Sequence, residues 1–65
     1  MGSRRFAEIL QLRGLVFLAL NQPGRCLRDL RAARDMGATN HELQEGLQKA
    51  QKLLEELETL VKGRF

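Results

Sequence analysis

The chain has 65 residues, with 11 Lys and Arg side chains against 8 Asp and Glu, and its formal net charge is +3. A composition of 43% hydrophobic and 29% charged residues is typical of a folded domain and excludes a disordered chain. A chain of this length forms one small domain or part of a larger one, whose core supplies only about 3–5 kcal/mol.

The residue inventory predicts neither a disulfide nor a metal site. Cys26 is the single cysteine, and with His41 it offers two of the four ligands that a structural zinc requires. The lone thiol favours a cytoplasmic or nuclear protein. The longest apolar run, Leu15–Leu20, is far shorter than the roughly 20 residues of a membrane span. We therefore expect no cofactor and no membrane partner.

Two clusters of turn-forming residues divide the chain into three helices. Asn21–Gly24 and Gly37–Asn40 predict breaks, because proline and glycine interrupt helices. The expected helices cover about 3–20, 24–36 and 40–62, which defines an all-α fold with antiparallel neighbours. Gly37 suits the left-handed position after a helix, and Thr39 with Glu42 has the T-x-x-E form of a capping box.

Apolar side chains recur at helical spacing in the second and third helices. In the second, Cys26, Leu27, Leu30 and Ala33 share one face, which we expect to be buried. The third helix carries apolar residues in steps of four and three, which is a heptad pattern. These residues are Leu43, Leu47, Ala50, Leu54, Leu57 and Val61, flanked by Leu53 and Leu60.

The hairpin of residues 7–40 resembles one tetratricopeptide repeat (TPR), a helix–turn–helix unit of 34 residues. The resemblance rests on the order glycine, aromatic, small, large, small, at Gly14, Phe17, Cys26, Leu30 and Ala33. It implies that Gly14 permits a close helix crossing and that Phe17 is buried there.

The resemblance also implies a domain layout. Residues 1–6 form an N-terminal extension, in which Met1–Ser3 is typical of residues left by cloning, and 7–40 form the repeat. Residues 41–62 form a capping helix with the heptad pattern, and 63–65 a tail. Two positions depart from the repeat pattern: Arg13 replaces a leucine, and Ala38 replaces a proline. We expect an α-solenoid fragment with three helices.

The pattern favours a protein–protein interaction module, a scaffold or adaptor fragment that docks a partner helix, a peptide or adjacent repeats. On the first helix we expect an apolar partner-binding strip of Leu12, Leu15, Leu18 and Ala19. The third helix is longer than the second, so its seam of Leu54, Leu57 and Val61 is expected to pair with a partner helix or a second copy, as a homodimer.

The alternative is a small basic adaptor associated with nucleic acid. Arg25, Arg28 and Arg31 recur along one face of the second helix and could contact the phosphates of an anionic partner. Base-stacking aromatic residues are scarce, which disfavours this reading. We predict no enzyme, because Cys26 is expected to be a small buried residue and His41 a solvated one, with no catalytic constellation around either.

Overall fold

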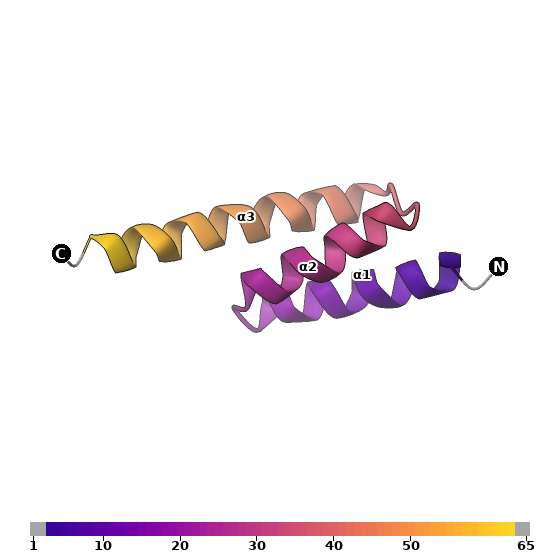
Figure 1. Cartoon of the computed structure of the whole chain (residues 1–65), viewed down its shortest axis with the longest axis horizontal. Coiled ribbons are helices and arrows are strands. Elements are labelled where there is room, and N and C mark those ends of the chain that lie inside the picture. Colours follow the sequence, from indigo (N-terminus) through magenta and orange to yellow (C-terminus); the bar gives the residue numbers. More distant parts are fainter. Residues whose placement is uncertain (1–2, 64–65) are drawn as a thin grey trace.

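The computed structural model describes residues 3–63, and their side chains from residue 5 onward. Three α-helices follow one another: α1 (Ser3–Ala19), α2 (Pro23–Asp35) and α3 (His41–Lys62). Successive helices run in opposite directions, joined by short turns (Figure 1). The described part of the chain is all-helical, which confirms the predicted class. Met1 and Gly2 of the N-terminal extension, and Arg64 and Phe65 of the tail, lie outside the described residues.

Every helix end lies within one residue of its predicted position. Pro23 begins α2 because its missing N–H is no loss in a first turn. Gly37 has a φ of 106°, the left-handed backbone expected of it. The prediction of Thr39 as the cap of α3 is wrong. Asn40 is the cap, and its side-chain oxygen accepts a hydrogen bond from the Leu43 backbone N–H at 2.9 Å.

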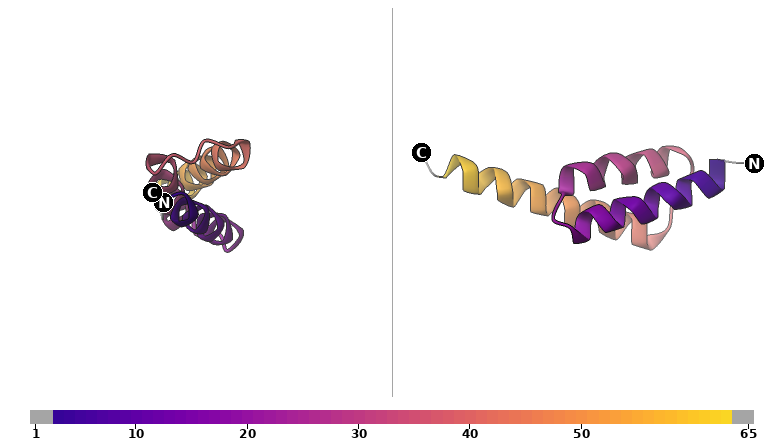
Figure 2. Two further views of the ribbon diagram at one scale, coloured as in Figure 1. Left: turned by 90° about the vertical axis from the view of Figure 1, so that its right-hand side faces the viewer. Right: turned by 90° about the horizontal axis from the view of Figure 1, so that it is seen from below.

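The core lies where α2 packs against both other helices. Figure 2 shows α1 and α3 splayed apart on one side, with α2 beside each of them. Cys26, Leu30 and Ala33 are fully buried, and Leu27 nearly so, which confirms the predicted face of α2. Ala7 and Leu10 close the core from α1, and Leu43 and Ala50 from α3.

Two glycines permit this close packing. A Cβ atom on Gly14 would lie 2.9 Å from Leu30 Cδ2 and 3.0 Å from Leu30 Cγ, so α1 and α2 approach as the sequence predicts. Gly46, in the second turn of α3, permits the close approach of two side chains. Its Cβ would lie 2.9 Å from both Leu15 Cδ2 and Leu30 Cδ1. One leucine of α2 therefore fits against a glycine on each neighbouring helix.

The molecule is elongated because α3 is longer than the hairpin beside it. The principal extents are 50 × 17 × 15 Å. The C-terminal part of α3 continues past the turn that joins α1 to α2 (Figure 1). Leu54 still packs on the core, beside Gly24 and Leu27. Every residue from 55 to 62 is exposed, and we call this segment the α3 extension.

Candidate interaction surfaces

A bidentate ion pair links α1 to α2 beside the crossing at Gly14. Arg13 Nε donates to Asp29 Oδ2 at 2.7 Å, and Nη2 donates to Oδ1 at 3.0 Å. The Asp29 side chain is only 6% exposed, whereas that of Arg13 is 60% exposed. The hydrogen bond and the charge of Asp29 raise the pKa of Arg13. This pair was not predicted, and it accounts for an arginine where the repeat pattern has a leucine.

Cys26 lies at the start of α2 and is fully buried, as predicted. Burial raises the pKa of its thiol, and the nearby Asp29 carboxylate raises it further. A hydrogen bond with the Leu18 backbone lowers it in part. The thiol is therefore held in its neutral, unreactive form. The residue fills a small space between helices and offers no nucleophile at the surface.

Phe17 is half-buried, so the prediction that it is buried at the helix crossing is wrong. It packs on the edge of the core, and the Arg25 guanidinium carbon lies 5.7 Å from the centre of its ring. Leu30, inserted between Gly14 and Gly46, occupies the crossing instead. Arg28 and Arg31 are exposed on α2, as expected of a solvated face.

A groove separates α1 from α3, and its floor is partly apolar. From α1 it is lined by Glu8, Gln11, Leu12, Leu15 and Leu18. From the start of α3 it is lined by Asn40, His41, Glu42, Glu45, Gly46 and Lys49. Three carboxylates against a single lysine make this groove acidic, which disfavours an anionic ligand.

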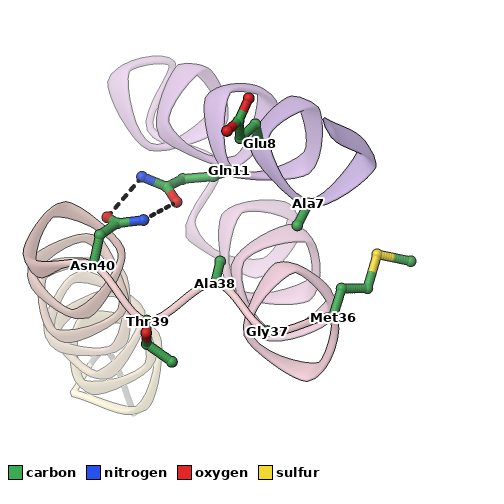
Figure 3. Close-up of a pocket in the computed structure, with 8 residues that line it drawn as sticks. All are labelled: Ala7, Glu8, Gln11, Met36, Gly37, Ala38, Thr39 and Asn40. Atoms are coloured by element: carbon green, nitrogen blue, oxygen red, sulfur yellow. Dashed lines mark hydrogen bonds between the residues drawn. The ribbon is translucent and has the colours of Figure 1, made fainter. Parts of the chain in front are cut away.

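A pair of amide side chains bridges the groove at the beginning of α3. Gln11 Nε2 donates to Asn40 Oδ1 at 2.9 Å, and Asn40 Nδ2 donates to Gln11 Oε1 at 2.7 Å. Figure 3 shows both bonds beside the 36–40 turn. Because Asn40 also caps α3, this contact connects the start of that helix to α1. Exposed His41 pairs with Glu45 at 3.1 Å, one turn along α3.

The predicted apolar strip of α1 is only partly available to a partner. Leu12 and Ala19 are exposed, but Leu15 and Leu18 are half-buried and pack on the core. The reason is Gly46, whose missing side chain leaves room for Leu15. These two leucines therefore face α3, and the exposed apolar surface of α1 lies farther around the helix.

That exposed surface is an outer strip on the face of α1 opposite Gly14. Its five large apolar side chains are between 52% and 66% exposed. They are Phe6, Ile9, Leu12 and Val16 on α1, and Leu20, which directly follows the helix. The sequence alone does not single out this face, because α1 carries apolar residues on other faces as well. Only the packing shows which of them are covered.

The predicted seam of α3 divides into a covered part and an exposed part. Leu53 and Leu54 are half-buried, so Leu54 belongs to the core and offers little to a partner. In the α3 extension the apolar side chains are between 40% and 69% exposed. They are Leu57, Leu60 and Val61. They continue the heptad face beyond the end of the hairpin.

Within residues 3–63, no three His, Cys, Asp or Glu side chains gather where they could hold a metal ion. In that same part of the chain, none of the helices combines the length and apolarity needed to cross a membrane. The surfaces left for function are the outer strip, the groove, the arginines of α2 and the α3 extension.

No protein-family model, no curated protein sequence and no solved structure matches this chain.

Proposed function

We propose that this chain is a protein–protein interaction module, which docks an amphipathic partner helix on the outer strip of α1. The observation that carries the proposal is the strip itself. Five large apolar side chains, each more than half exposed, lie along one helical face. A contiguous exposed apolar face of this kind marks a binding surface on a folded protein. A partner helix with its own apolar stripe is the complementary shape.

The proposed architecture is a TPR-like hairpin with a long closing helix, acting as a scaffold or adaptor fragment. The close approach of Leu30 to Gly14 supports it, since the repeat pattern places small residues at the helix crossing. The burial of Cys26 and Ala33 supports it in the same way. The half-buried position of Phe17 and the ion pair at Arg13 are departures from that pattern.

The test uses a synthetic amphipathic peptide of about 18 residues, five turns at 3.6 residues per turn, with a leucine stripe flanked by glutamates. Its binding to the protein is measured by fluorescence anisotropy for wild type and for Val16→Lys. We expect the Lys variant to bind at least about tenfold more weakly, because it places a charge in the apolar contact. Gln48→Lys adds the same charge at an exposed site on α3 and serves as the matched control.

Equal affinity for wild type and Val16→Lys would overturn the assignment to the outer strip. The same assay, run with single-stranded RNA as the probe, tests the arginine face of α2. RNA binding that falls by orders of magnitude between about 50 and 200 mM salt would favour that alternative. Apolar docking of the peptide should change little over this range.

A further inference from the structure

We infer that the partner helix is the α3 extension of a second copy, and that two copies exchange their extensions in a reciprocal dimer. The inference rests on the proposed function and names the occupant of the outer strip. Each extension lies on the α1 of the other copy, with Leu57, Leu60 and Val61 against the strip. The exposed apolar side chains of the extension and of part of the strip are thereby covered together.

The α3 extension is about half as long as the outer strip. The 15 residues of the strip, from Phe6 to Leu20, span about 22 Å at 1.5 Å per residue. The eight residues of the α3 extension span about 12 Å. One extension therefore covers roughly half of one strip, over its C-terminal part.

The position of the extension suits a closed, two-fold arrangement. It projects past the α1–α2 turn, into space that no other described segment of its own chain occupies (Figures 1 and 2). A two-fold axis beside this turn places the α1 of one copy alongside the extension of the other. The same operation forms the second, identical contact, so the assembly closes at two copies. In each contact the extension runs antiparallel to α1.

The charges beside the two surfaces are complementary. On the covered part of α1, Arg13 borders the strip, and its side chain, although paired with Asp29, is 60% exposed. On the extension, Glu56 precedes Leu60 and Glu58 precedes Val61 by one turn. Among the described residues, neither of these glutamates forms an ion pair within the chain. Opposite charges at the rim of an apolar contact fix its register.

The exposed area also fits such a dimer. The chain has an accessible surface of 5212 Å², whereas a compact monomer of this mass exposes about 4,200 Å². The difference, about 1,000 Å², is close to the roughly 800 Å² that each partner buries in a stable interface. The extension and the outer strip supply apolar side chains for that area.

The experiment measures mass by sedimentation velocity over a concentration series, for wild type, Val16→Lys, Leu60→Lys and an equal mixture of the two variants. Wild type should dimerise. Each variant alone carries the change in both contacts of its homodimer, so it should dimerise at least about 100-fold more weakly. The mixture can form a heterodimer in which one contact carries both lysines and the other is wild type.

The mixture should therefore recover dimer that neither variant forms alone. Gln48→Lys is the control for added charge, and circular dichroism checks that every variant keeps its helical content. A dimer made by two α3 helices pairing with each other would behave differently. Val16→Lys would then dimerise like wild type, and mixing it with Leu60→Lys would give no more dimer than the two variants give separately, which would overturn the exchange.

A wild-type protein that stays monomeric up to about 1 mM, the weakest range of specific affinity, would also overturn the inference. The amphipathic peptide separates this failure from failure of the proposed function. If the monomer binds the peptide and Val16→Lys weakens that binding, the outer strip docks a helix from another protein. If neither the peptide nor a second copy binds, the proposed function fails as well.

Discussion

The two parts of α3 share one heptad pattern and have opposite environments. In residues 41–54, Leu43 and Ala50 are buried and Leu47 and Leu54 pack on the core. In the α3 extension, Leu57, Leu60 and Val61 are exposed. The difference follows from where α2 begins. Leu54 shares a surface hollow with Gly24 and Leu27 of α2, and no described segment lies beside α3 beyond that point.

A periodic pattern therefore specifies an apolar face, but it does not specify whether another segment packs on that face. The same holds on α1, where Gly14 contacts Leu30 while Val16, on the opposite face, is exposed. The two uncovered faces lie at opposite ends of the sequence. The covered faces hold the single chain together, and the proposed association would use the uncovered ones.

The largest expected effect comes from matched substitutions in the two parts of α3. Leu43→Ala removes a fully buried side chain and should cost about 2–5 kcal/mol, which is comparable to the whole stability of so small a domain. Leu60→Ala changes the same residue type in the same helix, at an exposed site, and should alter the free energy of unfolding by no more than about 0.5 kcal/mol. Urea denaturation, at a protein concentration too low for dimerisation, measures the free energy of unfolding of both variants.

Equal destabilisation by the two alanine variants would contradict the division of α3 into a covered and an uncovered part. Leu60→Ala should instead weaken self-association in the sedimentation experiment. This variant therefore separates contacts that fold the chain from contacts that join two chains.

The next effect concerns Arg13, which borders both the core and the outer strip. Arg13→Met leaves the buried Asp29 carboxylate without its guanidinium partner, so the melting temperature should fall. Adding Asp29→Asn removes the buried charge while keeping its shape, and should recover part of that loss. If Arg13→Met melts like wild type, or if the double variant is less stable still, the ion pair does not stabilise the α1–α2 crossing.

The smallest effect is at the start of α3. Asn40→Ala removes the helix cap and the two bonds to Gln11, and should cost about 1 kcal/mol of unfolding free energy. Thr39→Ala, at the position that the sequence pattern predicts as the cap, should cost no more than a few tenths. Thermal unfolding of both variants measures the difference, and the reverse order of effects would restore Thr39 as the cap.

The three helices, their two breaks and the buried face of α2 could be predicted from local sequence alone. These features depend on neighbouring residues: Pro23 and Gly37 act on the local backbone, and Cys26, Leu30 and Ala33 share a face through helical periodicity. The close crossing at Gly14 was also predictable, since a glycine within an apolar helix allows close approach.

Contacts between helices determine which of several suitable residues caps α3, packs against Gly46 or is buried with its charge. Thr39 and Asn40 are both good caps, and Asn40 also bonds Gln11 on α1. Leu15 and Val16 are both apolar, and Leu15 alone meets the space left by Gly46. Asp29 is buried because Arg13 lies within reach on another helix. Each outcome depends on contacts between residues distant in sequence, which local periodicity does not encode.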